Sequence, residues 1–484
     1  MQSDINTSAL SFTVEAAPSY VSVSPPIRTT LCFITSDILA ICVALMSASL
    51  IRNAILRGSG SHLLAFAPAL AITLCSFMAA GLYPGVCVNP VEELRRCSLS
   101  VSLSFLCLLS VTFLRHDLSP SRLVYVVAYL LTLCLVPLLR TCTRSLLSDK
   151  PWWGSQVAIL GFGTTGKLVL ESLTKNPRIG LKPVAVLDDN PACYSELDGD
   201  VTRGPLSRCL DITREQRISH GILCMPNLSR PQLLGLLEQY SQCFSHLMVI
   251  PNLIGMSSLG ICAREVGGIV GVEVTQQLLR PSSRFAKRIL DLAFTLVVAP
   301  FVLLLIAMFA LLIKLEGPGP IFYANERIGR GGRKFKAWKL RSMVPDGDRV
   351  LAEYLGNHPA EAAHWHNTQK LKRDPRITRV GRIIRKTSID ELPQFWNVLN
   401  GNMSVVGPRP VLEQQVPIYG ASFSLYRQVR PGITGLWQVS GRNELAFSER
   451  VKLDKYVIQN WSVWLDIYIL ARTVSVLLTA KGAY

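Results

Sequence analysis

Cysteine is absent from the last 222 residues of this 484-residue chain (263–484), and all thirteen cysteines lie at or before Cys262. No pair has the C-x-x-C spacing of a zinc or redox motif, and the seven histidines form no cluster with ligand spacing. Eight cysteines lie between Cys32 and Cys142, in or beside apolar runs, where a thiol behaves as a small hydrophobe. The pattern argues against a disulfide framework and a zinc site, and it indicates a reducing compartment.

Charged residues are also few. They make up 17% of the chain against 49% hydrophobic residues, whereas soluble domains contain about 25% charged residues. The net charge is +17, and residues 285–484 contribute +13 of it, with 28 Lys or Arg against 15 Asp or Glu. The basic residues occur singly or in pairs, without a basic tail. The composition favours a membrane protein that binds anionic lipid or phosphorylated small molecules, and no nucleic acid is expected.

The first third of the chain contains four apolar segments close to the ~20 residues that a membrane-spanning helix needs. They are Thr29–Ile51, Leu63–Leu82, Cys97–Leu114 and Leu123–Leu139. We expect a disordered cytosolic tail over residues 1–28 and a four-helix transmembrane region over residues 29–150. If the N-terminus is placed in the cytosol, six basic residues flank the segments on the inner side and four on the outer side. This distribution favours a cytosolic N-terminus. Asp37 is an acid inside the first segment. It is either functional or paired within the bundle, and the sequence leaves its role unassigned.

Residues 151–280 have the pattern of an α/β lobe. An apolar strand precedes the turn G-F-G-T-T-G, and a second strand ends in an acid 22 residues after the last glycine. This order of strand, glycine turn, helix and acid is typical of a dinucleotide-binding unit. Leu168 stands where a P-loop has the Ser or Thr that binds Mg²⁺, so we reject nucleoside triphosphate hydrolysis. We expect a Rossmann-like accessory lobe, with either a scaffolding or dimer role or a nucleotide site at Gly161, Gly163, Gly166 and Asp188.

A fifth apolar stretch, Ile289–Leu312, has basic residues on both sides. Positive charge on both flanks indicates that both ends face the cytosol. Pro300 lies near the middle, where a proline removes a backbone hydrogen bond and kinks a helix. We therefore predict a re-entrant helix over residues 286–314 that enters one leaflet and returns. The alternative is a plain fifth span.

Asp390 and Glu391 form an adjacent acid pair in the segment K-T-S-I-D-E-L-P-Q. Ser388 and Glu391 have the spacing of a capping box, so one interpretation is structural, at the start of a helix that runs toward Leu399. The other interpretation is chemical. A helix N-terminus keeps Asp390 ionised and directs N–H groups at a phosphate, one carboxylate can act as nucleophile, and the other can hold Mg²⁺. The two interpretations are compatible.

Several cations precede or follow this pair. Lys339 and Arg341 are separated by one residue, and this strand spacing predicts that both face the same side. Arg385 is the last of four arginines at every third position and lies five residues before Asp390. Arg409 lies between two prolines that fix the backbone around it, which suits a preorganised cation.

Five sequence blocks, in order, resemble the bacterial sugar transferases, which are monotopic polyprenyl-phosphate phosphoglycosyl transferases. They are Lys339–Met343, Asp374–Thr378, Thr387–Gln394, Met403–Pro410 and Arg430–Arg442. The apolar N-terminal part is similar to the long subgroup of that family, which transfers galactose phosphate to undecaprenyl phosphate. The resemblance implies a membrane α-helical bundle, an α/β Rossmann-like lobe and a small α+β catalytic domain over residues 281–484 with a re-entrant membrane helix.

The resemblance also implies the activity. A hexose-1-phosphate is transferred from a UDP-sugar to undecaprenyl phosphate through a phosphosugar intermediate on Asp390. The expected sugar is galactose, and glucose is the alternative. Glu391 is the implied Mg²⁺ ligand. This step begins O-antigen, capsule or exopolysaccharide synthesis at the cytosolic face of the bacterial inner membrane. Whether the chain forms a homodimer is left open. The implied substrate-binding residues are Lys339, Arg341, Arg385, Arg409, Arg442 and Asp454.

Two other classes of function are less favoured. A membrane-anchored, NAD-dependent nucleotide-sugar epimerase or dehydratase needs a Tyr-x-x-x-Lys pair, and none of the thirteen tyrosines has Lys four residues later. A non-enzymatic transporter or polymerase partner leaves the five blocks unexplained. The sequence therefore predicts a phosphosugar transferase.

Overall fold

The computed structural model describes residues 26–56, 67–114, 122–196, 201–241, 243–251, 261–266, 269–274, 278, 280–358, 361, 371, 374–441 and 445–479. The chain forms two compact units, residues 1–255 and 256–484. The bundle and the α/β lobe lie within the first unit, and the domain bounds given by the sequence stay a prediction. Most of the expected N-terminal tail, residues 1–25, lies outside the described residues.

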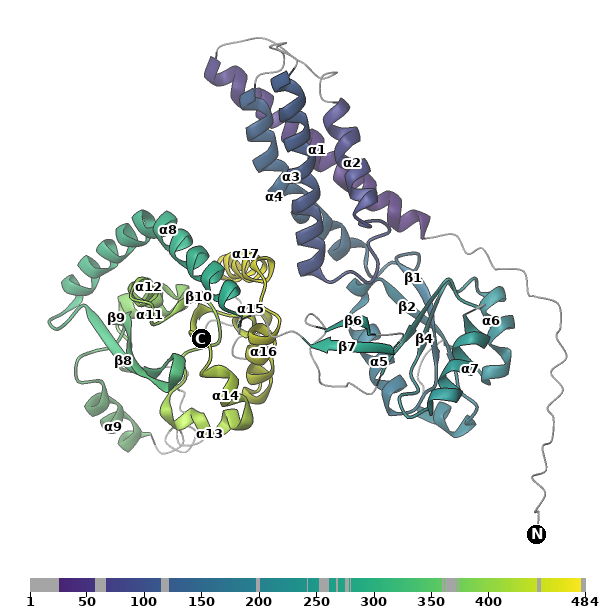
Figure 1. Ribbon diagram of the computed structural model, residues 1–484. Coiled ribbons are helices and arrows are strands. Elements are labelled where there is room, and N and C mark those ends of the chain that lie inside the picture. Colours follow the sequence, from purple (N-terminus) through teal and green to yellow (C-terminus); the bar gives the residue numbers. More distant parts are fainter. Residues whose placement is uncertain are drawn as a thin grey trace. The chain divides into compact units, whose positions relative to one another are not determined.

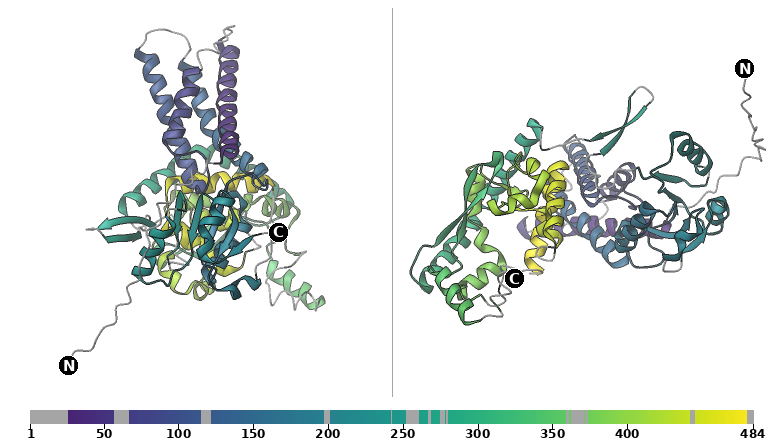
Figure 2. Two further views of the ribbon diagram at one scale, coloured as in Figure 1. Left: turned by 90° about the vertical axis from the view of Figure 1, so that its right-hand side faces the viewer. Right: turned by 90° about the horizontal axis from the view of Figure 1, so that it is seen from below.

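Four helices lie side by side in the first unit (Figures 1 and 2). They are α1 (Ile27–Leu56), α2 (Ala67–Ala79), α3 (Pro90–Leu114) and α4 (Arg122–Leu147). Among the described residues, α1, α3, α4 and one helix of the second unit, α8, are long and apolar enough to cross a membrane. The 13 described residues of α2 are fewer than the ~20 that a span needs. Each predicted apolar segment thus contains a helix.

Charged side chains are buried inside this bundle. Asp37 of α1 accepts a hydrogen bond from Nη2 of Arg140 on α4 (2.7 Å) and another from the hydroxyl of Tyr83 (2.6 Å). Glu93 of α3 accepts from Arg140 (3.1 Å) and from Arg144 (2.5 Å). Asp37 is therefore paired within the bundle, which was one of its two expected states.

The α/β lobe has a five-stranded parallel sheet in the order β3-β2-β1-β4-β5. Ala158 and Leu160 of β1 pack with helices α6 and α7 on one face, and Val157 and Ile159 pack with α5 on the other. Because both faces are covered, the strand is apolar at nearly every position. The elements are β1 (Ser155–Leu160), α5 (Thr164–Lys175), β2 (Leu181–Leu187), β3 (Thr202–Gly204), α6 (Cys209–Glu215), β4 (His220–Leu223), α7 (Arg230–Tyr240) and β5 (His246–Val249).

The second unit combines helices with three two-stranded sheets, of which β6-β7 and β8-β9 are antiparallel and β10-β11 is parallel. Its strands are β6 (Ile261–Val266), β7 (Ile269–Val274), β8 (Phe322–Ile328), β9 (Lys334–Leu340), β10 (Ser404–Val406) and β11 (Gly432–Thr434). Its helices are α8 (Pro281–Glu316), α9 (Gly347–Asn357), α11 (Arg379–Thr387), α12 (Gln394–Leu399), α13 (Val416–Tyr419), α14 (Phe423–Tyr426), α15 (Leu436–Ser440), α16 (Phe447–Gln459) and α17 (Val463–Thr479).

Helix α8 is attached to this unit at both ends. Near its start Asp291 accepts from the hydroxyl of Ser404 (2.8 Å), and near its end Ile313 packs against Ile384. The helix continues through Pro300, where we expected a break, and Figure 1 shows it as two arms joined by a bend. The middle of the helix exposes apolar side chains: Leu296, Val297, Phe301, Leu303 and Leu304.

Candidate active site

The acid pair lies on a single 3₁₀ turn, η8 (Ile389–Glu391), between α11 and α12. Ser388 ends α11 in the left-handed conformation (φ 58°), and its N–H donates to the carbonyl of Arg385 (3.3 Å). Pro393, which has no N–H to bond back to η8, precedes α12. Ser388 is both the C-cap of α11 and the N-cap of η8, but its side chain makes no capping hydrogen bond, so the predicted capping box does not form.

Lys339 of β9 lies between the two carboxylates. Its Nζ is 3.1 Å from Oδ2 of Asp390 and 2.8 Å from Oε1 of Glu391. The side-chain amide of Asn397, on α12, bonds to the backbone of β9 on both sides of Ala337 (3.1 and 2.8 Å), which holds the strand against the segment with the acids. One ammonium and two carboxylates from distant parts of the chain thus form a single, largely buried cluster.

The two carboxylates differ in basicity. Burial raises the pKa of Asp390, the charge of Glu391 adds to the effect, and Lys339 only partly offsets it. Burial acts on Glu391 in the same direction, but Lys339 and Arg409 outweigh it and the pKa of Glu391 is lowered. The pKa values of these neighbouring carboxyl groups are thus shifted in opposite directions.

Two guanidinium groups lie near the acid pair. Arg409, in the Pro-Arg-Pro turn after β10, and Arg327 of β8 both lower the pKa of Glu391 through their charge. Arg327 pairs with Phe335 across the hairpin, and Phe335 and Lys339 are four residues apart on β9. Arg327 therefore lies on the same face of the hairpin as Lys339. Burial lowers the pKa of Arg327, and the charge of Arg409 adds to this effect. Sequence analysis missed Arg327, although the two-residue alternation along the hairpin would have indicated it.

Arg409 is held from two sides. Asp454 of α16 is buried, accepts from the hydroxyl of Tyr419 (2.8 Å) and bonds to the backbone of Arg409. Burial raises the pKa of Asp454 to about 7. The guanidinium of Arg409 lies 5.4 Å from the ring centroid of Trp437, and that of Arg450 lies 4.9 Å from it. Trp437 is itself buried, so it is a core residue that also positions a cation.

Arg341 has a different place from the one that its spacing predicted. Its guanidinium donates to the carbonyls of Ile313 (3.1 Å) and Gly317 (2.9 Å) and so caps the end of α8. The backbone N–H of Arg341 still bonds across the hairpin to the carbonyl of Ile321 (2.8 Å), so it is the side chain, bonded to the end of α8, that does not join Lys339. The structure thus separates these two predicted phosphate ligands.

Arg385 and Arg442 complete the predicted cations. Arg385 is exposed in the last turn of α11, and its charge lowers the pKa of Asp390 and of Asp374. This places it near the acid pair, on the solvent side. Arg442 lies outside the described residues.

Glu391 and Asp390 offer an incomplete set of metal ligands. Within the described residues no three His, Cys, Asp or Glu side chains are grouped as a metal site. Mg²⁺ is normally bound by one or two protein carboxylates together with water and substrate phosphates. An ionised Glu391 beside Asp390 fits such a set, with the diphosphate of a substrate supplying the other ligands.

The glycine turn of the α/β lobe is described as well. Gly161 has a φ of 90°, and a Cβ on Gly166 would lie 2.2 Å from the carbonyl oxygen of Gly161, so both positions require glycine. The N–H of Phe162 donates to the carboxylate of Asp188 (2.6 Å). The acid that a dinucleotide site uses for the ribose is thus bonded to the turn itself. Gly163 has open space around it, and a nucleotide at this turn stays a prediction.

Comparison with known proteins assigns a family. The bacterial sugar transferase family matches residues 282–480, and a CoA-binding domain family matches residues 78–251. The chain is 38% identical to the UDP-galactose-lipid carrier transferase of Erwinia amylovora and 35% identical to the undecaprenyl-phosphate galactose phosphotransferase of Salmonella typhimurium, in each case over 75% of this chain and 76% of that protein. It is 30% identical to the UDP-glucose:undecaprenyl-phosphate glucose-1-phosphate transferase of Escherichia coli, over 76% of this chain and 78% of that protein. The chain belongs to the bacterial sugar transferase family.

Proposed function

We propose that this chain transfers galactose-1-phosphate from UDP-galactose to undecaprenyl phosphate and releases UMP. The observation that supports this most directly is the buried cluster of Asp390, Lys339 and Glu391, which pairs a basic carboxylate with a phosphate-binding cation. Galactose is preferred because the two relatives named for it share 38% and 35% identity with the chain, against 30% for the relative named for glucose. The product, undecaprenyl-diphosphate-galactose, begins the synthesis of a surface polysaccharide.

In the first step a carboxylate oxygen of Asp390 attacks the phosphorus that bears galactose. The bond from this phosphorus to the oxygen of UMP breaks, and the sugar phosphate stays on Asp390 as an acyl phosphate. Lys339 pairs with Asp390 in the structure and passes to the phosphate oxygens as the carboxylate reacts. Arg409 and Arg327 are near enough to compensate the charge that develops on the equatorial oxygens.

In the second step a phosphate oxygen of undecaprenyl phosphate attacks the same phosphorus. The bond to Asp390 breaks, its carboxylate is restored, and the new diphosphate leaves with the lipid. Neutralising the incoming phosphate and the phosphate already on Asp390 again requires cations, and Lys339, Arg327 and Arg409 supply three. Asp454 acts only through Arg409, whose backbone it holds.

Glu391, with its lowered pKa, is the residue that we assign to Mg²⁺, together with the substrate diphosphate. Bound there, the ion neutralises diphosphate charge and makes UMP a better leaving group. Lys339, which shares its charge between Glu391 and Asp390, keeps both carboxylates in place before substrate binds.

For α8 we propose a re-entrant path that enters one leaflet and returns. Both ends pack on the same unit, while the middle exposes apolar side chains. Straight, its 36 residues would extend about 54 Å, well beyond the ~30 Å of hydrocarbon that a span has to cross. A bent helix keeps the acid pair on the cytosolic face of the bacterial inner membrane, where nucleotide sugars are.

The test uses the purified full chain in nanodiscs with Mg²⁺ and either UDP-galactose or UDP-glucose, without a lipid acceptor. We expect UMP release and a galactose-phosphate adduct in the intact mass of the wild type, and neither in Asp390→Asn. Asp346→Asn, at an acid with a 71% exposed side chain, is the matched control and should behave as wild type. An adduct with UDP-glucose alone would transfer the assignment to glucose, and no UMP even after addition of undecaprenyl phosphate would overturn the proposal.

A further inference from the structure

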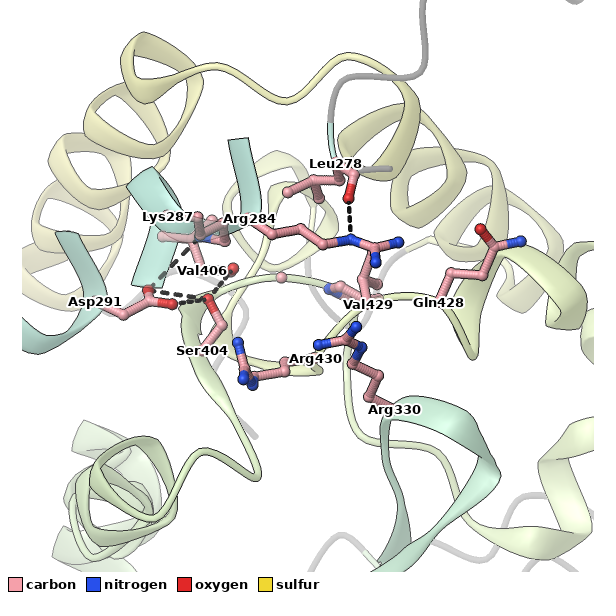
Figure 3. Close-up of a pocket in the computed structure, with 12 residues that line it drawn as sticks. Leu278, Arg284, Lys287, Asp291, Arg330, Ser404, Val406, Gln428, Val429 and Arg430 are labelled. Atoms are coloured by element: carbon pink, nitrogen blue, oxygen red, sulfur yellow. Dashed lines mark hydrogen bonds and ion pairs between the residues drawn. The ribbon is translucent and has the colours of Figure 1, made fainter. Parts of the chain in front are cut away.

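A second group of cations lies in a cavity behind the Pro-Arg-Pro segment. Figure 3 shows Arg284, from the first turn of α8, and Arg330, from the turn between β8 and β9, approaching the same space from two sides. Arg430, ahead of β11, also lines the cavity, and its side chain turns to the side of Ser404. Gly407 and Pro408 form part of the wall, and none of Asp390, Glu391 and Arg409 lines the cavity. None of the three arginines has a role in the proposed reaction.

These arginines have no acidic partner. Within the part of the chain that the structure describes, no carboxylate lies in ion-pair distance of Arg284, Arg330 or Arg430. The one acid that lines the cavity, Asp291, accepts two bonds from the hydroxyl of Ser404 (2.9 and 2.8 Å) and one from a backbone N–H (3.0 Å). The carboxylate charge of Asp291 is thus already stabilised by these hydrogen bonds.

The terminal nitrogens of these side chains remain available. Arg284 donates through Nε to the carbonyl of Leu278 (2.7 Å), and Arg430 donates through Nε to the carbonyl of Gly401 (2.7 Å). Both bonds orient the guanidinium and leave its outer edge for an anion. Burial lowers the pKa of Arg430, the charges of Arg288, Arg330 and Arg284 lower it further, and the charge of Asp291 offsets only part of this effect, so positive charge dominates around Arg430.

The cavity has the size of a phosphate group. Its volume is about 30 Å³, room for two or three water-sized groups at the roughly 10–15 Å³ that each requires. This is too small for a nucleotide or a sugar. Close to Arg284 on α8, two apolar side chains are exposed, Phe285 (69%) and Ile289 (51%), so the same helix supplies both a lining residue of the cavity and apolar surface.

We propose that this cavity binds the phosphate group of a membrane lipid, with Arg284, Arg330 and Arg430 as its ligands and the acyl or prenyl chain lying along α8. The inference rests on the proposed insertion of α8 into one leaflet. The phosphate of undecaprenyl phosphate and that of an anionic phospholipid have the same chemistry here, as does free inorganic phosphate. Guanidinium groups suit a phosphate ligand because they bind phosphate oxygens in a bidentate manner.

The experiment is native mass spectrometry of the full chain released from detergent micelles. Equal amounts of undecaprenyl phosphate, phosphatidylglycerol or phosphatidylcholine are added, and the fraction of chain that retains one lipid is measured. We expect retention of undecaprenyl phosphate, phosphatidylglycerol or both in the wild type, and a loss of at least fivefold in Arg284→Gln/Arg330→Gln. The matched control, Arg333→Gln/Arg349→Gln, removes the same charge outside the cavity and should retain lipid as the wild type does.

A folding defect is separated from a lost ligand by Arg284→Lys/Arg330→Lys, which keeps the charge and should recover most of the retention. Equal loss in the Lys and Gln variants, or equal retention in the Gln variant and the wild type, would overturn the proposal. So would displacement of the lipid by inorganic phosphate at equal concentration, because the site would then bind the free ion. UMP release from UDP-galactose is measured on the same wild-type sample, so a failed transferase assignment is distinguishable from failed lipid binding.

Discussion

Two buried ionic clusters in this chain differ in how completely their charges are balanced. In the membrane bundle, Asp37 and Glu93 face Arg140 and Arg144, two acids against two cations. Arg140 uses Nε, Nη1 and Nη2 in hydrogen bonds. Nothing in that cluster is left for a ligand.

At the candidate active site the balance is different. Asp390 and Glu391 share a single ammonium, and Arg327 and Arg409 add positive charge that no direct ion pair neutralises. The pKa of Asp390 stays raised despite these cations, because burial opposes its charge. A charge-balanced ionic cluster holds helices together. A cluster whose charges are not balanced contains groups whose charge is compensated only when substrate binds. The difference predicts opposite consequences of mutation in the two regions.

The largest effect is expected from Asp390→Asn. Loss of the nucleophile should reduce transfer by about 10⁴-fold or more, since no other carboxylate occupies its position. Initial rates of UMP release, with UDP-galactose and undecaprenyl phosphate, measure this. The thermal midpoint should change little, because Lys339 still has Glu391 as partner. A large fall in stability together with activity would mean that the cluster is structural, like that of the bundle.

Arg140→Met should show the converse behaviour. Removing this cation leaves the buried Asp37 without its ion-pair partner, while Glu93 keeps Arg144, and breaking such a buried pair costs about 3–5 kcal/mol. Denaturant unfolding of the full chain in detergent measures the loss. Lys175→Met is the control, because its ion pair with Glu171 is exposed and screened by solvent, so its loss should change the unfolding free energy little. Folded Arg140→Met protein should release UMP at the wild-type rate, and an inactive but stable variant would contradict the structural role.

Lys339→Met is expected to affect activity more than stability. The variant loses the group that meets phosphate charge in the transition state, which corresponds to about 10²–10³-fold in kcat. It also leaves Asp390 and Glu391 without their shared cation, so the pKa of both should rise and the pH–rate profile should move to higher pH. Rates between pH 5.5 and 9 test this. Partial rescue by Lys339→Arg, with no shift of the profile, would confirm that charge is what matters.

The sequence predicted most of this architecture because its signals are local. Apolar length indicated the helices, the strand–turn–helix pattern indicated the parallel lobe, and adjacent acids indicated the site. The capping box was predicted wrongly because S-x-x-E describes residue spacing and not backbone conformation, and Ser388 in the left-handed region also ends α11. Arg341 was misplaced because strand spacing does not predict that its side chain bonds to carbonyls at the end of α8.

Arg327 and Tyr419 were missed for another reason. Their roles depend on contacts with residues far along the chain, Glu391 for the first and Asp454 for the second. No pattern next to either residue indicates such a contact. Sequence resemblance found Asp454 but not its environment, since burial depends on how α13 and α16 pack.

The smallest predicted effect concerns Asp454, whose pKa is raised by burial from 3.8 to about 7. Between these values the folded chain keeps a proton that the unfolded chain has lost, so stability falls as the pH rises, by at most about 1.4 kcal/mol per pH unit. Asp454→Asn cannot ionise and keeps an acceptor for Tyr419, so its thermal midpoint should fall less steeply than that of the wild type between pH 5.5 and 7.5. Asp346→Asn should keep the wild-type slope. Identical slopes in wild type and Asp454→Asn would mean that Asp454 is ionised throughout this range, and the buried carboxyl would then belong with the charge-balanced cluster of the bundle.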